Sequence, residues 1–327
     1  MPRGCPLSEP AICVIVNPGS RDGEEAGREL HDALGGRGDV VIRQSLHEGH
    51  ARELAAEAAR EGFATVVAAG GDGTVNEVVN GLEPFLDRVR LGILPRGTGN
   101  DFARTLGLPE GLAEGLAILT RGEVRRCDLV EVTAGDWRRV FINVSAGGFS
   151  ADMNENLTAD VKQAWGPLAY FRAAAESLPE RTVYRASLLF DDHWREVEAV
   201  LNVVVANGRF VAGGIPVAPY AEIDDGLFDV VVVKECSLAA LATLAPKVLV
   251  GGHLEDTEDL VAFRQARRLV VASEPPMRFN VDGEMLGEET ITFRILPGAL
   301  EVVAPSAAPI AGSEGPPIVN GDAKTRS

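Results

Sequence analysis

Glycines and a carboxylate stand together in the motif GGDGT at Gly70–Thr74. The preceding run Thr65–Ala69 is small, β-branched and apolar, which is typical of an inner strand of a parallel sheet. The three glycines indicate a tight turn with positive φ, or a ligand close to bare backbone. Apolar side chains then recur at helical spacing over Thr74–Leu82, and the free amides of a helix N-terminus favour phosphate. Asp72 would repel phosphate unless a cation lies between them, so the motif predicts a metal–nucleotide site, with an ordinary βα turn as the alternative.

A second segment, RLGILPRGTGNDFARTLGL at Arg90–Leu108, repeats the same plan. Leu91–Leu94 is predicted as a strand, and Asp101–Leu106 as a short helix that Thr98 or Asn100 can cap. Asp101 in the first helical turn could serve only to stabilise the helix dipole. In a parallel sheet both glycine loops would project from the carboxyl ends of the strands, where ligands bind.

These motifs and three later ones resemble the soluble bacterial lipid kinases of the diacylglycerol kinase and sphingosine kinase superfamily. The quoted stretches are GGDGTVNEV (Gly70–Val78), LPRGTGNDFAR (Leu94–Arg104), FINVSAGGF (Phe141–Phe149), DDGLFDV (Asp224–Val230) and FNVDGE (Phe279–Glu284). The GGDG turn alone is shared with NAD kinases and phosphofructokinase-like enzymes. Five motifs in the family's order, spread between about Ala11 and Pro305, make a specific match.

The resemblance implies a set of residues that contact ATP. No GxxxxGK[ST] loop and no protein-kinase signature occurs, so the two glycine loops must hold the phosphates. In its first loop the family has a glycine and then a basic residue after the serine, and here Arg21 and Asp22 take these two places. Arg21 is therefore a candidate to replace the family's basic phosphate contact. The nucleotide-binding residues implied by the resemblance are Asn17, Ser45, Gly70, Gly71, Asp72, Gly73, Thr74, Val75, Asn76, Gly97, Thr98, Asn100 and Asp101.

The general base that takes the acceptor's proton has two candidates. The resemblance assigns this role to Glu284, with Asp282 near the phosphates or their metal. From the pattern alone Glu284 could be an exposed hairpin residue, because Asp282–Gly283 is a strong turn signal. Asp72 is the rival base, a role that the sphingosine kinase branch suggests, and it could instead bind magnesium through water.

A magnesium site is implied around AEIDDGLFDV, with ligands from Glu222, Asp225 and the carbonyl of Leu227. A simple turn between strands is the alternative. Asp128 matches an acidic position that the family places near the active site. Lys162 matches a family lysine but reads equally well as surface charge.

The order of elements predicts two domains and a tail. Residues 9–133 alternate strands and helices, which predicts an α/β nucleotide-binding domain with a parallel sheet and helices on both faces. Residues 134–305 read as mostly antiparallel strands of a sandwich-like, lipid-binding domain, with helical interruptions at 158–178 and 238–251. Residues 306–327 turn to Pro, Gly, Ser and Ala and are expected to be disordered.

Composition limits the partners. The net charge of −17 argues against nucleic acid, since no basic stripe offsets it. No apolar run is long enough to span a membrane, and no signal peptide is visible. The four cysteines show no paired spacing, which favours a cytoplasmic protein. Contact with a lipid substrate is then expected to be peripheral, at the membrane surface, and a homodimer is left open.

These observations predict an ATP- and Mg²⁺-dependent kinase that phosphorylates a lipid hydroxyl, with diacylglycerol as the first choice of substrate. The alternatives within this class are phosphatidylglycerol, ceramide-like or sphingoid-base, and undecaprenol-like acceptors. Outside it, the alternatives are an NAD kinase or sugar kinase and a nucleotide-binding regulator without catalysis. The DDG and NVDGE motifs speak against an NAD kinase, and the set Asp72, Asp101, Asp225 and Glu284 speaks against a regulator.

Overall fold

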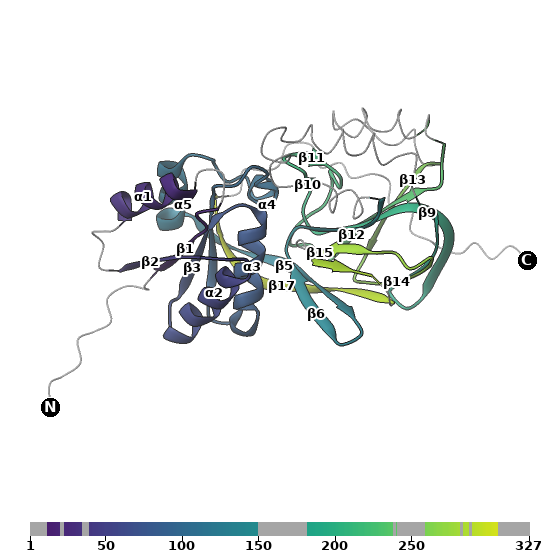
Figure 1. The fold of residues 1–327 in the computed structure, drawn as a ribbon, viewed down its shortest axis with the longest axis horizontal. Coiled ribbons are helices and arrows are strands. Elements are labelled where there is room, and N and C mark those ends of the chain that lie inside the picture. Colours follow the sequence, from purple (N-terminus) through teal and green to yellow (C-terminus); the bar gives the residue numbers. More distant parts are fainter. Residues whose placement is uncertain are drawn as a thin grey trace, which may run out of the picture.

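The structure is a computed structural model, and it describes residues 12–19, 23–34, 39–149, 182–237, 240, 259–281, 284–287 and 290–306. Its first part alternates strands and helices, as the sequence predicts (Figure 1). The elements in chain order are β1 Ile12–Val16, α1 Gly23–Leu34, β2 Val40–Gln44, α2 His50–Glu61, β3 Thr65–Gly70, α3 Asp72–Leu82, the 3₁₀ turn η1 Glu83–Phe85, β4 Arg90–Pro95, α4 Asp101–Thr105 and α5 Leu112–Arg121.

The four strands form a parallel sheet in the order β4-β3-β1-β2. Strand β3 is buried along its whole length, as its continuous apolar run predicts. Helices α2, α3 and α4 pack with one face of the sheet in a core that includes Leu82 and Phe102. Helices α1 and α5 cover the other face through Leu30, Leu116 and Leu119. The predicted α/β arrangement with helices on both faces is therefore confirmed.

The second part is mostly antiparallel, which confirms the predicted fold class. Strand β9 is its centre, because β7, β8 and β12 all pair with it in antiparallel register. The strands in chain order are β5 Glu123–Ala134, β6 Trp137–Phe141, β7 Val144–Gly148, β8 Tyr184–Phe190, β9 Trp194–Ala206, β10 Phe210–Val211, β11 Ile215–Pro216, β12 Phe228–Lys234, β13 Val261–Ala266, β14 Arg268–Glu274, β15 Phe279–Val281, β16 Glu284–Leu286 and β17 Ile291–Ala304.

Strand β17 joins the two parts. It runs antiparallel to β5 over most of its length, and its last residues return to the first sheet, where Val302 pairs in parallel with Leu91 of β4. The carboxyl-terminal strand therefore completes the edge of the nucleotide-side sheet. The predicted division into residues 9–133 and 134–305 stays a prediction, and β17 connects the two sides of it.

Strands β6 and β7 are separate elements, because β6 ends at Phe141 and β7 begins at Val144. The chain leaves the ladder between them because the Asn143 carbonyl accepts hydrogen bonds from the amides of Asn207 and Gly208. Strand β13 and the short β10–β11 hairpin were not predicted. The helices predicted at 158–178 and 238–251, most of the predicted tail, Arg21 and Lys162 lie outside the described residues.

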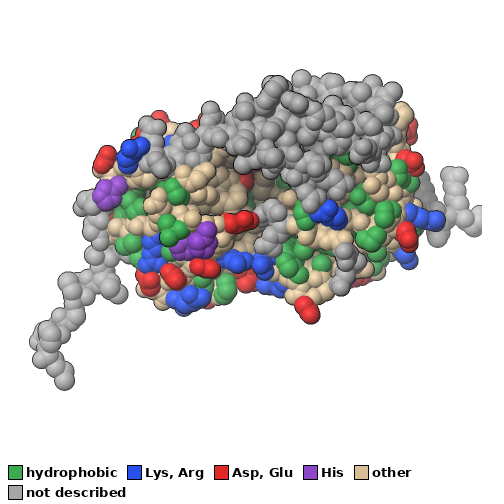
Figure 2. Space-filling view, viewed as in Figure 1, with side chains coloured by type: hydrophobic (Ala, Val, Ile, Leu, Met, Phe, Trp, Pro, Cys, Tyr) green, Lys and Arg blue, Asp and Glu red, His purple; other side chains and the backbone are tan. Residues whose placement is uncertain are grey.

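The described helices include none that is both long and apolar enough to cross a membrane. Figure 2 shows acidic and basic side chains interspersed over the visible face, without a continuous basic stripe among its described residues.

Candidate active site

The two glycine loops touch each other at the carboxyl ends of β3 and β4. A Cβ on Gly97 would lie 2.4 Å from the Cα of Gly71, and one on Gly71 would lie 3.1 Å from the Cα of Gly97. A Cβ on Gly70 would lie 2.4 Å from Oγ1 of Thr74. None of these three glycines has a positive φ, so backbone approach, rather than a left-handed turn, explains them. A Cβ on Gly73 would meet nothing within 4 Å, which leaves open space above the first turn of α3.

Asp72 caps the neighbouring helix as well as lying in its own. Its Oδ1 accepts a hydrogen bond of 3.0 Å from the amide of Phe102 in α4. Its Oδ2 faces Gly99, where a Cβ would lie 2.9 Å from this oxygen. The Asp72 carboxylate therefore holds the second glycine loop against the first, through the hydrogen bond that its Oδ1 accepts.

Asn100 closes the second loop rather than capping α4. Asn100 is the N-cap residue of α4 and has a left-handed backbone conformation, with φ 51°. Its side chain makes no cap hydrogen bond to the helix. Instead Oδ1 accepts from the amide of Gly97 at 2.9 Å, and Nδ2 donates to the Gly97 carbonyl at 2.8 Å. The predicted capping role of Asn100 is wrong, and Thr98 is exposed at the tip of the loop.

Asp101 links the glycine loops to the second part of the chain. Its two carboxylate oxygens accept hydrogen bonds from the amides of Gly213 and Gly214, at 3.0 and 2.7 Å, in the turn between β10 and β11. Burial, and then the charge of Asp72, raises the pKa of Asp101 to about 6. Dipole stabilisation is therefore not its only task, because it docks the β10–β11 hairpin onto α4.

Hydroxyl and amide groups gather at the ends of β1, β2 and β3. Nδ2 of Asn17 donates to Oγ1 of Thr74 at 3.0 Å. Ser45 is buried, and its amide donates to the Val16 carbonyl at 2.9 Å. The predicted contacts from the first two strands thus lie beside the start of α3. Thr74 and Asn76 are also buried there, each 4% exposed.

Val75 has a different place from the other predicted nucleotide contacts. Its side chain is 3% exposed and belongs to the core between α2, α3 and the sheet. Only its main chain can face a ligand.

Asp128 holds the predicted magnesium loop in place. Its carboxylate oxygens accept hydrogen bonds from the amides of Gly226, at 2.7 Å, and Gly298, at 2.6 Å. Its own amide donates to the Ile223 carbonyl at 2.6 Å. Asp128 is 1% exposed, and burial raises its pKa. The sequence placed this residue near the site, and the structure adds that it anchors residues 222–227.

A pocket of about 430 Å³ lies between helix α3 and strand β15, which precedes the candidate base Glu284. Helix α3 is called the phosphate-side helix below because it follows the first glycine loop. Gly73, Asn76 and Asn80 line it from α3, and Val281 lines it from the end of β15. Glu284 starts β16 and pairs with Val281, so it lies at the same hairpin. Asp282, Gly283 and the side chain of Glu284 lie outside what the structure describes. The other lining residues are Glu48, Gly49, Arg52, Glu77 and Arg139.

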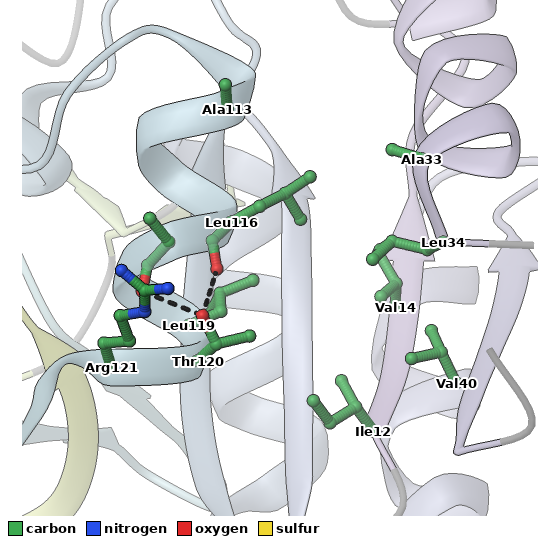
Figure 3. Close-up of a pocket in the computed structure, with 11 residues that line it drawn as sticks. Ile12, Val14, Ala33, Leu34, Val40, Ala113, Leu116, Leu119, Thr120 and Arg121 are labelled. Atoms are coloured by element: carbon green, nitrogen blue, oxygen red, sulfur yellow. Dashed lines mark hydrogen bonds between the residues drawn. The ribbon is translucent and has the colours of Figure 1, made fainter.

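A second pocket, of about 310 Å³, lies between α1 and α5 (Figure 3). Its walls are mostly aliphatic, with Val14 on the sheet and Leu34 and Leu116 on the two helices. It is on the opposite face of the sheet from α3, and none of the predicted site residues lines it.

Comparison with known proteins agrees with this arrangement. The family model for the diacylglycerol kinase catalytic domain matches residues 11–132, and the model for the YegS C-terminal NAD kinase beta sandwich-like domain matches residues 143–304. A diacylglycerol kinase from Bacillus subtilis (strain 168) is 34% identical over 258 residues, which cover 79% of this chain and 83% of that protein. The chain belongs to the diacylglycerol kinase and YegS-like lipid kinase family.

Two further relatives support the assignment. A Chromohalobacter salexigens protein named "Probable lipid kinase YegS-like" is 36% identical over 272 residues, which cover 82% of this chain and 85% of that protein. The crystal structure of a diacylglycerol kinase from Bacillus anthracis str. Sterne superimposes with a TM-score of 0.69 at 25% identity, covering 90% of this chain and 97% of that one. This member of the lipid kinase family is therefore a phosphotransferase with an alcohol group as acceptor, and a kinase of this kind uses ATP.

The predicted metal ligands of this lipid kinase can be tested for their fit to Mg²⁺. Burial raises the pKa of Asp225, and the charges of Glu222, Asp128 and Asp224 raise it further, against a hydrogen bond from the Leu227 amide that lowers it. Arg125 pairs with the neighbouring Asp224 at 2.7 Å. Within the described residues no cluster of three His, Cys, Asp or Glu side chains could hold a metal ion. Mg²⁺ commonly binds through one or two carboxylates and keeps several waters, so the donor types of Glu222, Asp225 and the Leu227 carbonyl suit it, and this site stays a prediction.

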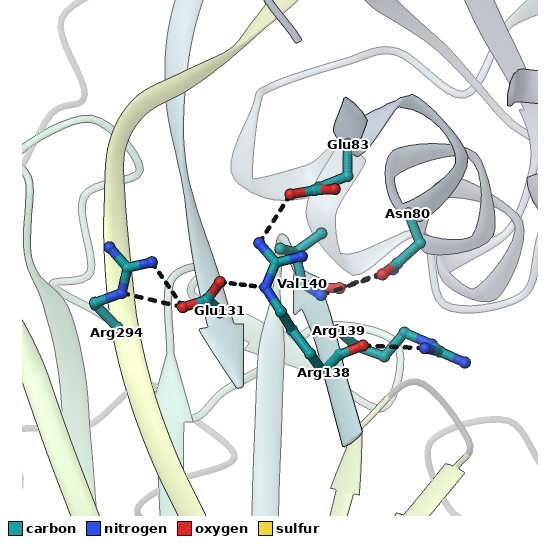
Figure 4. Close-up of polar contacts among 7 residues, drawn as sticks. All are labelled: Asn80, Glu83, Glu131, Arg138, Arg139, Val140 and Arg294. Atoms are coloured by element: carbon teal, nitrogen blue, oxygen red, sulfur yellow. Dashed lines mark hydrogen bonds and ion pairs between the residues drawn. The ribbon is translucent and has the colours of Figure 1, made fainter. Parts of the chain in front are cut away.

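Two residues that position the site were missed by sequence reasoning. Asn207 is fully buried, and its Nδ2 donates to the carbonyls of Asp128, at 3.0 Å, and Ile142, at 2.8 Å. Asn80 connects α3 to β6 through its side-chain amide (Figure 4). Both asparagines form hydrogen bonds to main-chain groups that are distant in sequence, so no local spacing pattern predicts their role.

Proposed function

We propose that this lipid kinase transfers the γ-phosphate of ATP to a hydroxyl of diacylglycerol, which gives phosphatidic acid. The observation that carries the proposal is the pocket of about 430 Å³, which has Gly73 of the phosphate-side helix on one wall and Val281 of the β15–β16 hairpin on another. A phosphoryl donor and a proton acceptor have to meet in one such space.

The nucleotide side of the proposal consists of the two glycine loops. The open space above Gly73 and the main-chain amides at the start of α3 suit the phosphates. Asn17, Ser45 and Thr74 surround them with polar groups, and Asp72 joins the loops. The lipid enters from the second part of the chain.

Glu284, the first residue of β16, takes the proton of the lipid hydroxyl as its oxygen attacks the γ-phosphorus. The bond from the γ-phosphorus to the bridging oxygen breaks in the same transfer, and ADP leaves. Asp282 lies two residues earlier in the same hairpin and would lie near the phosphates. Mg²⁺ held by Glu222, Asp225 and the carbonyl of Leu227 would supply positive charge to this acidic region. Asp101, through Gly213 and Gly214, keeps the β10–β11 hairpin docked beside the nucleotide loops.

The acceptor is an amphiphile, so the enzyme is proposed to work at a membrane surface through peripheral contact. The choice of diacylglycerol rests on relatives whose names state that activity. Phosphatidylglycerol, ceramide-like, sphingoid-base and undecaprenol-like lipids are the competing acceptors.

A direct experiment identifies the acceptor. The enzyme is incubated with Mg²⁺, ATP labelled in its γ-phosphate, a total lipid extract and NAD, and the labelled product is identified by chromatography and mass spectrometry. Labelled phosphatidic acid is expected. A different labelled phospholipid would replace diacylglycerol as the substrate, and label in NADP with no labelled lipid would refute lipid phosphorylation altogether.

A further inference from the structure

Arg96 lies where the two glycine loops meet. It follows directly on β4, and its amide donates a hydrogen bond of 2.9 Å to the carbonyl of Gly70. The next residue, Gly97, is the one whose backbone touches Gly71. The main chain of Arg96 is thus held on the floor of the proposed nucleotide site.

The guanidinium group of Arg96 lacks the partners that its burial demands. Its side chain is 13% exposed, and its Nε and Nη2 atoms are buried without a hydrogen-bond partner among the described residues. An arginine carries five N–H donors, and buried donors of a charged group are normally satisfied. The nearest carboxylate is Glu29 of α1, whose Oε2 lies 3.8 Å from Nη2, too far for a hydrogen bond.

Other arginines of the chain show the contrast. Arg294 bonds to Glu131 through two nitrogens, at 3.0 and 2.7 Å, and Arg138 bonds to Glu83 at 2.8 Å (Figure 4). These ion pairs have hydrogen-bonding geometry, whereas the pair of Arg96 and Glu29 does not. Nε and Nη2 of Arg96 therefore have unused hydrogen-bonding capacity, which a partner can take up once the atoms that cover them move aside.

The surrounding charge identifies the chemistry of that partner. Asp72 and Asp101 both approach Gly99, and the charge of Asp72 raises the pKa of Asp101. A polyphosphate that enters beside these carboxylates needs a cation close by. Guanidinium groups match phosphoryl oxygens with two parallel hydrogen bonds, which makes Arg96 suited to this task.

We propose that Arg96 binds the phosphoryl oxygens of the nucleotide with its Nε and Nη2 groups. This inference rests on the proposed function for the location of the nucleotide, and it adds a phosphate contact that none of the family motifs assigns to this position. The competing interpretation is a structural ion pair between Arg96 and Glu29.

The two interpretations predict different behaviour of matched variants. Arg96→Leu, Arg96→Lys and Glu29→Gln are compared with the wild type by titration calorimetry, with Mg-ATP and with adenosine as probes. Arg96→Leu is expected to weaken ATP binding by at least about tenfold and to leave adenosine binding unchanged, because only ATP carries phosphates. Arg96→Lys should retain part of the ATP affinity, since it keeps the charge without the planar fork. Glu29→Gln should bind ATP within about twofold of the wild type.

Several results would overturn the assignment. The first is that Arg96→Leu binds ATP as tightly as the wild type does. The second is that Arg96→Leu loses affinity for ATP and for adenosine by the same factor. The third is that Glu29→Gln loses as much ATP affinity as Arg96→Leu does. Thermal melting is recorded for each variant, and Arg96→Gln, which keeps polar volume, replaces Arg96→Leu if the latter does not fold cooperatively. These binding measurements use no lipid. A wild type that binds ATP through Arg96 but phosphorylates no lipid would refute the proposed function and leave the role of Arg96 standing.

Discussion

The side-chain amide of Asn80 pairs with the main chain of Val140 as a neighbouring strand would. Its Nδ2 donates to the Val140 carbonyl at 2.8 Å, and its Oδ1 accepts from the Val140 amide at 3.1 Å (Figure 4). The same Nδ2 donates to the carbonyl of Asn76 at 3.0 Å. Asn80 thereby connects the last turn of the phosphate-side helix α3 to strand β6.

Asn80→Ala should loosen this connection without unfolding the chain. Val140 is only 1% exposed, so its freed amide and carbonyl would be left buried without these partners. We expect a loss of about 1–2 kcal/mol of unfolding free energy, because a hydrogen-bonded pair is lost. We also expect at least about tenfold lower kcat, with ATP affinity within about twofold, since the two halves of the site are no longer held in register. Urea unfolding, nucleotide titration and lipid phosphorylation measure these three quantities.

The control for this prediction is Glu83→Gln. Glu83 forms an ion pair with Arg138 in the same contact between α3 and β6, and the Arg138 side chain is 46% exposed. An exposed pair of this kind contributes about 0–1 kcal/mol, so turnover should stay normal. If Asn80→Ala turned over as fast as Glu83→Gln, the connection would have no part in catalysis.

Asp101 should give the stability of the enzyme a measurable pH dependence. Its folded-state pKa of about 6 lies above the ordinary aspartate pKa of 3.8, so the folded state holds this proton more tightly than the unfolded state. Stability from this carboxyl is fully present below about pH 4 and falls as the pH rises to about 6. The loss is at most about 3 kcal/mol, from 1.36 kcal/mol per pKa unit.

Asp101→Asn isolates this contribution. The variant loses a constant amount of stability at every pH, because an amide can accept from only one of the two glycine amides. The asparagine also has no carboxyl group that titrates in this range. The wild type should therefore lose unfolding free energy relative to the variant as the pH rises from 4 to 7. Denaturant unfolding of both proteins across this range gives the difference. A difference that does not change with pH would show that Asp101 has an ordinary pKa.

Magnesium should stabilise the enzyme through residues 222–227. If Glu222, Asp225 and the Leu227 carbonyl bind the ion, it adds about 2.7 kcal/mol at a hundredfold excess over its Kd. The melting temperature should therefore rise with Mg²⁺ in the absence of ATP, and Asp225→Ala should abolish the rise. Asp224→Ala is the neighbouring control, because Asp224 pairs with Arg125 at 2.7 Å. An equal rise in Asp225→Ala would place the stabilising ion elsewhere.

Some elements could be predicted from sequence because their signals are local. The buried strand β3, the turn at Gly70–Gly71 and helix α3 follow from an apolar run, glycines and helical spacing within one short segment. Of the two explanations that the sequence left open for these glycines, positive φ does not apply, and the close approach to backbone at Gly71 is made by Gly97, a residue of another loop.

Other parts depend on contacts between distant residues, which spacing does not reveal. Asn207 bonds to the carbonyl of Asp128, 79 positions earlier, and Asp101 bonds to the amide of Gly213, 112 positions later. The break between β6 and β7 also comes from residues 207–208 rather than from a local turn signal. The sequence therefore located the candidate residues, and the fold shows what holds them together.

Asp72→Asn should keep the fold and remove activity. The asparagine Oδ1 can still accept from the Phe102 amide, so the loops stay joined. The lost charge should lower kcat by about 100-fold or more, through disturbed use of Mg-ATP. Turnover at varied Mg²⁺ and a thermal melt test this. Near-normal turnover with an unchanged melt would remove Asp72 from the mechanism.

The central claim is that Glu284 deprotonates a lipid hydroxyl held opposite bound ATP, and single-turnover phosphoryl transfer by Glu284→Gln tests it most directly. Enzyme in excess over labelled ATP is mixed with diacylglycerol micelles and Mg²⁺, and ATP affinity is measured separately. Glu284→Gln should bind ATP with near-normal affinity and form labelled phosphatidic acid at least about 100-fold more slowly than the wild type. Transfer at the wild-type rate, together with an Asp72→Asn variant that binds Mg-ATP normally and fails only in chemistry, would contradict the account and make Asp72 the base.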